Sequence, residues 1–215
     1  EFRGLPEVQT AVEQKPTVEM EQEDEQQFPP RSSRLLVMAV ERYAQVDPQS
    51  PRLLGLRWGA DGPTVAAALS SRPQPLSLSG ESALGPYIAE FRTDGVVLLR
   101  LEGRARLTFL DPLSDQSQLF LSAVEVRIDA ERNGLSADQL ESTFEELLGL
   151  SIARWRPAEV RDERQEGRRS VLFDVADVRI NFLLDAPEGV FSVEYVDRWH
   201  RDAIRDTLET ITGQP

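Results

Sequence analysis

Closely spaced carboxylates are the groups in this sequence that could carry acid–base or metal chemistry. Asp174 and Asp177 lie three positions apart, with Asp185 and Glu194 further along the chain. Two carboxylates held together could act in hydrolysis or bind a divalent cation. Carboxylates on strand surfaces commonly face an arginine, however, and Arg179 is close by in the sequence. We therefore retain Asp174 and Asp177 as candidates for a surface site and assign no catalytic residue.

Each of the three tryptophans has an arginine as a sequence neighbour. The three segments are Arg57-Trp58, Arg154-Trp155-Arg156 and Arg198-Trp199-His200. Aromatic rings flanked by cations could stack a nucleotide base. The simpler interpretation is that the rings point inward while the arginines, which are the predominant basic residue here, point outward. Trp155, Arg156 and Trp199 are retained only as candidates for a surface site.

His200 is the single histidine of the chain and lies between Trp199 and Arg201. A histidine at such a position is most often a surface residue or a helix cap. A role as a proton relay needs an acidic or nucleophilic partner, which the sequence does not locate. His200 completes the set of candidates for a surface site.

Residue types exclude several kinds of chemistry. The chain has no cysteine, so it holds no disulfide, zinc–thiolate site or iron–sulfur cluster. It also lacks the glycine-containing signatures of phosphate loops, dinucleotide-binding turns and serine-nucleophile elbows. We predict no metal and no cofactor, and we favour a non-enzymatic protein while leaving catalysis open.

The charge balance argues against nucleic acids and membranes as partners. The 215 residues include 24 basic and 37 acidic side chains, which gives a net charge of −13. Nucleic acids and anionic membranes both attract basic surfaces. No apolar stretch is long enough to span a bilayer, so we predict no nucleic-acid binding and no membrane insertion.

Lysine and cysteine usage bears on the source and location of the chain. Lys15 is the only lysine among the 24 basic residues, which is typical of a GC-rich genome and favours a bacterial source. The lack of cysteine is compatible with either side of a bacterial membrane. We favour the cytoplasm; the alternative is the periplasm or secretion, if an upstream segment has been removed.

The beginning of the chain differs in composition from the rest. Residues 1–30 carry eight acidic side chains against Arg3 and Lys15, a net charge of −6, and lack apolar periodicity. Such a segment buries too little surface to offset the entropy lost on ordering it. We predict a flexible acidic tail or stalk over residues 1–33 and a single folded domain over residues 34–215.

Alternation of apolar and polar residues predicts the strands in the middle of the chain. Val97–Phe109 alternates over thirteen positions, so we predict one long half-buried strand with a charged outer face. Thr93-Asp94-Gly95 before it is predicted to be a hairpin turn that follows a strand over 87–92. A third strand is predicted over 120–128.

The second half of the chain repeats a similar order of elements. Ser136 followed by Gln139 is typical of a capping box, and we predict a helix that ends at Gly149. Within the strand predicted over 171–184, the apolar parity shifts, which predicts a β-bulge near Ala176-Asp177. The other predicted elements are a strand over 152–160, a charged loop over 161–169, a strand over 191–195 and a final helix bearing Ile204, Leu208 and Ile211.

The segment after the acidic tail is predicted to be partly helical. The serines at 32 and 33 favour a helix over 31–46, with a strand as the alternative, because Leu36, Met38 and Val40 alternate. The remaining predictions are a short strand over 53–58, a short helix after Asp61 with Pro63 in its first turn, and a loop over 70–86.

The order of three strands, a helix, three strands and a helix predicts an α+β domain. We expect a mainly antiparallel meander sheet with helices packed on one face. The repeated order is compatible with two strand–strand–strand–helix units related by duplication, over 87–149 and 150–213.

Two functions remain open. The first is a non-enzymatic protein–protein interaction or assembly module, with a protein partner and with the acidic tail as a flexible tether; the edges of its strands could accept a partner strand. The alternative is a small-molecule or lipid carrier with an apolar cavity between sheet and helices. The sequence predicts neither the identity of the partner nor the oligomeric state.

Overall fold

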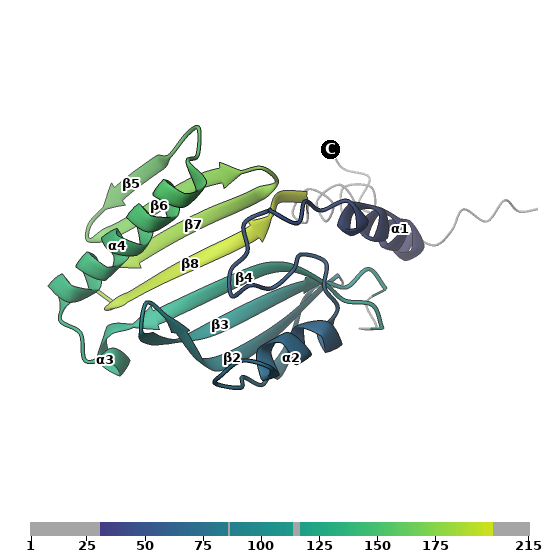
Figure 1. Cartoon of the computed structure of the whole chain (residues 1–215), viewed down its shortest axis with the longest axis horizontal. Helices are drawn as coiled ribbons and strands as arrows, with labels where there is room; N and C mark the ends of the chain where they lie inside the picture. The colour runs from purple at the N-terminus through teal and green to yellow at the C-terminus, as the bar shows by residue number, and fades with distance from the viewer. Residues whose placement is uncertain (1–30, 86, 114–116, 200–215) are drawn as a thin grey trace, which may run out of the picture.

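The computed structural model describes residues 31–85, 87–113 and 117–199 (Figure 1). Within these ranges the helices are α1 (Arg31–Ala44), α2 (Gly62–Ser70), α3 (Ala130–Asn133) and α4 (Ala137–Trp155). The strands of the same ranges are β1 (Ser79–Gly85), β2 (Ile88–Leu98), β3 (Leu101–Leu110), β4 (Phe120–Asp129), β5 (Arg161–Gln165), β6 (Arg168–Val175), β7 (Val178–Asp185) and β8 (Val190–Asp197). The acidic tail over residues 1–30, His200 and the final predicted helix lie outside the described residues.

The described strands form one antiparallel sheet with the order β1-β2-β3-β4-β8-β7-β6-β5. Two four-stranded meanders, β1–β4 and β5–β8, therefore meet where β4 pairs with β8. At this central seam Glu125 lies opposite Glu194, and Val126 lies opposite Val193. The prediction of an α+β domain with a mainly antiparallel meander sheet is confirmed.

A contiguous hydrophobic core lies against one face of both meanders. Leu107 of β3 and Phe182 of β7 are fully buried. Phe144 of α4 contacts Phe182 and Phe191, with ring centroids 6.1 and 6.2 Å apart. Buried side chains of α1 and α2 belong to the same core. Aromatic contacts of this kind add to the free energy gained by burying the rings.

The two N-terminal helices form as predicted. α1 is a helix rather than the alternative strand, and it buries Leu35, Ala39 and Tyr43 at helical spacing. α2 begins after Asp61, whose Oδ1 accepts a hydrogen bond from the backbone N–H of Thr64 at 2.8 Å. This bond satisfies a backbone donor that the first helical turn leaves without a partner.

The strand predicted over 53–58 is wrong. These residues form turns, because Leu54 and Gly55 have φ angles of 56° and 68°, in the left-handed region. Trp58 is nevertheless buried, and its Nε1 donates a hydrogen bond to the carbonyl of Pro51 at 2.9 Å. The apolar residues of this segment are buried individually, without strand pairing.

Helix α4 starts as predicted but ends later. Ser136 and Gln139 form the capping box. The helix continues past Gly149 to Trp155, so the predicted strand over 152–160 is wrong. Gly149 has helical neighbours that bury Leu148 and Ser151, and the left-handed cap falls instead at Arg156, with φ 46°. A helix ends at a glycine when the following turn has no side chain to bury. Here the following turn buries Ser151, so the helix continues.

The long strand predicted over Val97–Phe109 is in fact a hairpin. β2 ends at Leu98, Leu99 and Arg100 form the turn, and β3 begins at Leu101. The predicted turn residue Gly95 lies instead at a register shift within β2, with φ 74°. Glycine supplied the left-handed conformation that a β-bulge needs, and the true turn has no glycine.

The bulge predicted near Ala176-Asp177 is also wrong, because these residues form the turn between β6 and β7. Val175 lies opposite Val178, and Ala176 has φ 51°. A two-residue turn places its flanking residues on the same face of the sheet, so the apolar parity shifts across it. A turn without glycine and a bulge therefore give the same sequence pattern.

Two strands form where loops were predicted. β1 lies within the predicted loop over 70–86, and β5 lies within the predicted charged loop over 161–169. All five residues of β5 are exposed, so the strand shows no apolar alternation. Its stabilisation comes from backbone pairing with β6 at the sheet edge. Each meander therefore has four strands rather than the three predicted.

Candidate interaction surface

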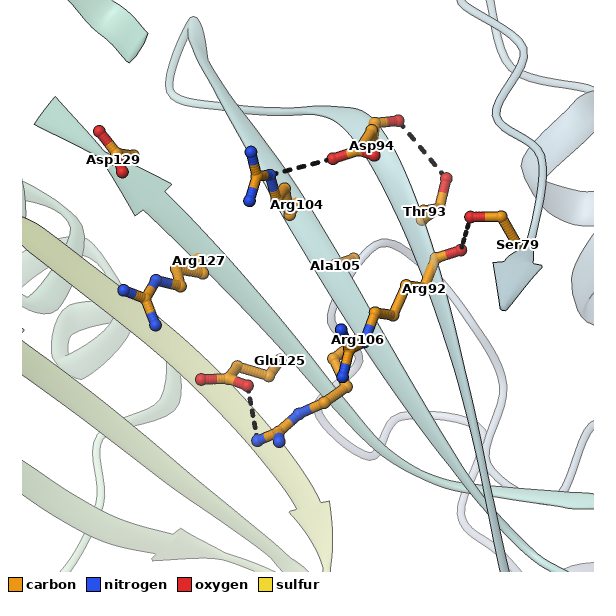
Figure 2. A pocket seen from close by; sticks show the side chains of 10 residues that line it. All are labelled: Ser79, Arg92, Thr93, Asp94, Arg104, Ala105, Arg106, Glu125, Arg127 and Asp129. Atoms are coloured by element: carbon orange, nitrogen blue, oxygen red, sulfur yellow. Dashed lines mark hydrogen bonds and ion pairs between the residues drawn. The ribbon is translucent and has the colours of Figure 1, made fainter. Parts of the chain in front are cut away.

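Four arginines lie together on the face of the sheet that turns away from the core. The strand alternation that buries every second residue of β3 and β4 exposes Arg104, Arg106 and Arg127. The register places Arg104 opposite Arg127, and Arg92 of β2 opposite Arg106. These four side chains line a hollow of about 700 Å³ (Figure 2). We call them the arginine cluster.

Like charges directly opposite each other on neighbouring strands destabilise a sheet. The Arg92–Arg106 pair is compensated by two carboxylates. Glu90 is 2% exposed, and its Oε1 lies 3.0 Å from Arg92 Nη2 while its Oε2 lies 3.7 Å from Arg106 Nη1. Glu125 Oε2 lies 2.7 Å from Arg106 Nη2. This half of the cluster is therefore neutralised within the protein.

The Arg104–Arg127 pair is compensated less. Arg104 Nε lies 3.2 Å from Asp94 Oδ1, as Figure 2 shows, but the same oxygen lies 3.6 Å from Arg132 Nη1. Arg127 is exposed, and within the described ranges it forms no ion pair with a carboxylate. A guanidinium can bind a carboxylate with two parallel hydrogen bonds. Arg127 and its neighbour Arg104 are thus placed to bind a carboxylate from outside the sheet.

The predicted candidate Asp174 is held by arginines. Its Oδ1 lies 3.0 Å from Arg179 Nε across the β6–β7 ladder, and its Oδ2 lies 3.4 Å from Arg198 Nη1. The hydrogen bonds from Arg179 are the main cause that lowers the pKa of Asp174. The interpretation that Asp174 faces Arg179 is confirmed. A carboxylate with a lowered pKa that is already paired is poorly suited to act as a general acid.

The other predicted carboxylate, Asp177, belongs to a different group of charges. Its Oδ2 lies 2.9 Å from Arg42 Nη2 of α1, and the same nitrogen lies 3.3 Å from Asp197 Oδ1 at the end of β8. Asp174 and Asp177 thus bind different arginines rather than forming one carboxylate pair. Arg42 ties α1 to the β6–β7 turn and to β8.

Asp197 is a buried acid that the sequence did not reveal. Its side chain is 2% exposed, and burial is the main cause that raises its pKa, against the opposing effect of Arg42. Burial also raises the pKa of the adjacent Tyr43 hydroxyl. The residue follows an inward-facing alternation with Val193 and Tyr195, and that parity was the signal that could have identified it.

The tryptophan candidates have structural surroundings. Trp155 ends α4 with the guanidinium of Arg154 4.6 Å from its ring centroid. Arg156 is exposed and caps α4. Trp199 contacts Tyr43 edge-on, with ring centroids 5.8 Å apart. No contact joins Trp155 to Trp199 among the described rings, so these residues do not form one stacking platform.

Within residues 31–85, 87–113 and 117–199, no group of three or more His, Cys, Asp or Glu side chains could hold a metal ion. No helix of these ranges combines the length and apolarity needed to cross a membrane.

Comparison with known proteins adds no relative. No protein-family model, curated protein or solved structure matches the chain. A function must therefore be inferred from the residues themselves.

Proposed function

We propose that this protein is a non-enzymatic interaction module that binds a partner protein through the arginine cluster. The observation that carries the proposal is the Arg104–Arg127 pair, in which two like charges face each other and Arg127 has no ion-paired carboxylate in the described ranges. Such a pair costs stability in the unbound protein. A carboxylate of a partner would remove that cost, so the proposed partner presents acidic side chains to this face.

The proposal assigns different roles to the two faces of the sheet. We infer that the helices cover the face opposite the arginine cluster. In support, Leu140 of α4 and Val65 of α2 belong to the core that also contains the inward-facing Leu107. The face that carries Arg104 and Arg127 is then left for a partner.

A relation between the two meanders extends the same inference. From each edge of the sheet to the seam, the strands follow in chain order: β1 to β4 from one edge and β5 to β8 from the other. Duplication of one four-stranded unit would produce this symmetry. The two units differ on the outer face. Arg127 of β4 lies opposite Ser192 of β8. At this level the first meander has the pair Arg104–Arg127, whereas the second has the pair Leu183–Ser192, which contains no arginine. The proposed binding role belongs to the β1–β4 unit.

Two alternatives have less support. An enzyme would need a carboxylate able to exchange protons, but Asp174 and Asp177 are both held by arginines. A carrier would need a cavity between α4 and the sheet, and that space contains packed rings. The fully buried phenylalanines of the core are Phe109, Phe144, Phe173, Phe182 and Phe191. Native mass spectrometry of the purified chain should accordingly show no stoichiometric small molecule.

The test is recovery of a partner by charge-reversed variants. The tagged native chain is cross-linked in cells, purified and analysed by mass spectrometry beside Arg104→Glu/Arg127→Glu. The matched control is Arg57→Glu, which changes an exposed arginine outside the sheet. We expect one protein at stoichiometric yield with the native chain and the control, and its loss from the double variant. Equal recovery from all three chains would exclude the arginine cluster as the binding site.

A further inference from the structure

We infer that the partner also contacts the outer face of the second meander (β5–β8), through an apolar patch across the central seam from Arg127. The apolar patch consists of Leu172, Leu183 and Val190. The inference rests on the proposed function, extends its site beyond β1–β4 and names the chemistry of the partner. That partner presents apolar side chains to the patch and a carboxylate to Arg104 and Arg127.

The ladders place Leu183 and Arg127 in one row on the same face of the sheet. Ser192 of β8 lies opposite Leu183 of β7 on one side and opposite Arg127 of β4 on the other. Figure 2 shows Arg127 next to the yellow ribbon of β8. Neighbouring strands are about 4.8 Å apart, so Leu183 is about 10 Å from Arg127 across the strands. One partner surface can therefore contact both residues.

Two other apolar residues adjoin Leu183 diagonally. Leu172 of β6 lies opposite Asn181, and Val190 of β8 lies opposite Asp185. Asn181 and Asp185 are each two positions from Leu183 on β7, so Leu172 and Val190 are diagonal neighbours of Leu183, about 7–8 Å away. Val190 is buried, Leu172 is half-buried and Leu183 is 41% exposed. Leu183 thus projects to solvent from an apolar surrounding.

The side chains beside Leu183 in its row are small and uncharged. They are Ser170 of β6 and Ser192 of β8. Towards the end of β7, the carboxylate of Asp185 is already paired, since its Oδ2 lies 3.0 Å from Arg168 Nε. A partner that packs on Leu183 therefore does not have to bury an unpaired charge there, which would cost free energy. The centre of a protein interface is typically depleted of charged residues in the same way.

The charges of the arginine cluster do not by themselves supply a strong attraction. Its four arginines are balanced by four carboxylates, those of Glu90, Asp94, Glu125 and Asp129. Arg127, which has no ion-paired carboxylate in the described ranges, can orient a partner carboxylate through two parallel hydrogen bonds. Burial of apolar surface is the larger source of free energy in most protein association. The apolar patch provides such a surface next to Arg127.

The area of the face supports the same extension. β6, β7 and β8 have eight residues each, which corresponds to a length of about 27 Å. Over that length the three strands β2–β4 present about 400 Å², and the six strands from β2 to β6 present about 800 Å². A stable protein interface buries about 800 Å² on each partner. The strands of the arginine cluster alone are too narrow for this, whereas the six-stranded face is sufficient.

The distance between Leu183 and Arg127 favours a helix as the contacting element of the partner. Residues seven positions apart lie on one face of a helix and are about 10.5 Å apart along its axis. Residues on one face of an extended strand are about 7 or 14 Å apart, which fits 10 Å less well. We therefore expect an amphipathic helix that crosses the strands, with an apolar and an acidic residue seven positions apart.

The experiment captures the partner from two positions of the full chain. The photo-cross-linking residue p-benzoylphenylalanine replaces either Leu183 or Val97, which is 49% exposed and lies opposite Glu102, two positions before Arg104. The matched control replaces Leu150 of α4, which is 53% exposed. After irradiation in cells, the cross-linked peptides are identified by mass spectrometry.

We expect positions 183 and 97 to capture the same protein and position 150 not to capture it. The two cross-links should lie about 14 residues apart in one helix of the partner, because about 20 Å separates the two positions on the sheet. Capture of the partner at position 97 alone would overturn the inference. Capture of a second copy of this chain at position 183 would also overturn it, in favour of self-association.

Substitutions separate this inference from the proposed function. Leu183→Gln should lower recovery of the partner at least fivefold, as loss of an apolar anchor does, whereas Leu150→Gln should not change it. Thermal melts verify that both variants fold. Full recovery with Leu183→Gln and loss with Arg104→Glu/Arg127→Glu would overturn the inference and leave the proposed function standing. Loss with Leu183→Gln and full recovery with the double variant would overturn the proposed function, because the arginine cluster would then not bind the partner.

Discussion

The two hairpins at β2–β3 and β6–β7 have two-residue turns without glycine, yet the turns are held in different ways. Leu99 and Arg100 both have left-handed φ angles, of 49° and 71°, and Leu99 is 37% exposed. In the β6–β7 turn only Ala176 is left-handed, and Asp177 binds Arg42 of α1. The first turn thus keeps two unfavourable backbone conformations, whereas the second is fixed by an ion pair to a helix.

The base of the first hairpin has its own support. The backbone N–H of Glu102 donates to Asn133 Oδ1, and Asn133 Nδ2 donates to the carbonyl of Glu102, both at 2.8 Å. α3 therefore fixes β3 just after the turn, as Arg42 of α1 fixes the second turn. A turn sequence unsuited to its conformation therefore persists where a helix holds the turn or the adjoining strand.

The largest expected effects compare the inner faces of the two hairpins. Leu107→Ala in β3 should lower the free energy of unfolding by about 2–5 kcal/mol, and Phe182→Ala in β7 by about 3–5 kcal/mol, because both side chains are fully buried. Arg104→Ala is the exposed control and should change it by at most about 0.5 kcal/mol. Urea unfolding followed by circular dichroism measures all three. A loss at Arg104 as large as that at Leu107 would contradict the assigned faces.

An intermediate effect comes from the turns themselves. Leu99→Asn/Arg100→Gly should raise the free energy of unfolding by about 1–2 kcal/mol, because Asn and Gly adopt left-handed conformations at lower cost. Ala176→Gly removes the cost of one left-handed residue. It should raise the free energy of unfolding by less than about 1 kcal/mol, because glycine also has more freedom in the unfolded chain. Thermal melts of both variants test the order. A destabilised Asn-Gly variant would show that Leu99 and Arg100 make contacts that outweigh the backbone cost.

The smallest effects concern pH and distinguish the carboxylates near the second hairpin. Arg179 lowers the pKa of Asp174 in the folded protein. The stabilising contribution of Asp174 to the free energy of unfolding is therefore present above the unfolded pKa of about 4, and it is lost as pH falls through the folded pKa. Burial raises the pKa of Asp197 in the folded protein. The contribution of Asp197 to the free energy of unfolding is therefore fully present below the unfolded pKa of about 4, and it is lost as pH rises through the folded pKa.

Asparagine variants separate these two slopes. Asp174→Asn should reduce the loss of stability on the acid side, and Asp197→Asn should reduce the loss as pH rises above about 4. Urea unfolding midpoints measured from pH 3 to 7 give both slopes. Slopes that change in the same direction for the two variants would contradict the assigned causes.

Sequence patterns predicted faces better than connections. Leu107 and Arg104 have the exposures that alternation indicates, and α2 and the capping box of α4 form at the predicted residues. The turns were misplaced because local steric signals do not report which backbone groups pair. Gly95 lies in a bulge rather than in a turn. The parity shift at Ala176-Asp177 would arise from a bulge or from a two-residue turn, and the structure has the turn.

The candidate site was predictable in part. Alternation alone turns Arg104 and Arg106 to the outer face, but the approach of Arg127 requires the register between β3 and β4. The sequence also could not show that Asp177 and Asp197 share Arg42, because the three residues come from distant parts of the chain. Long-range pairing, which depends on the whole core, decided both arrangements.

The central seam has a consequence for the order in which the chain assembles. Ladder pairs within each meander join residues close in sequence, whereas the seam joins residues such as Glu125 and Glu194, which are 69 positions apart. Closing a longer loop costs more entropy, and non-local contacts form more slowly. We therefore expect each meander to form its own ladders first and the closing of β4 on β8 to be the late step. Until then, both strands present unpaired edges to any other chain nearby.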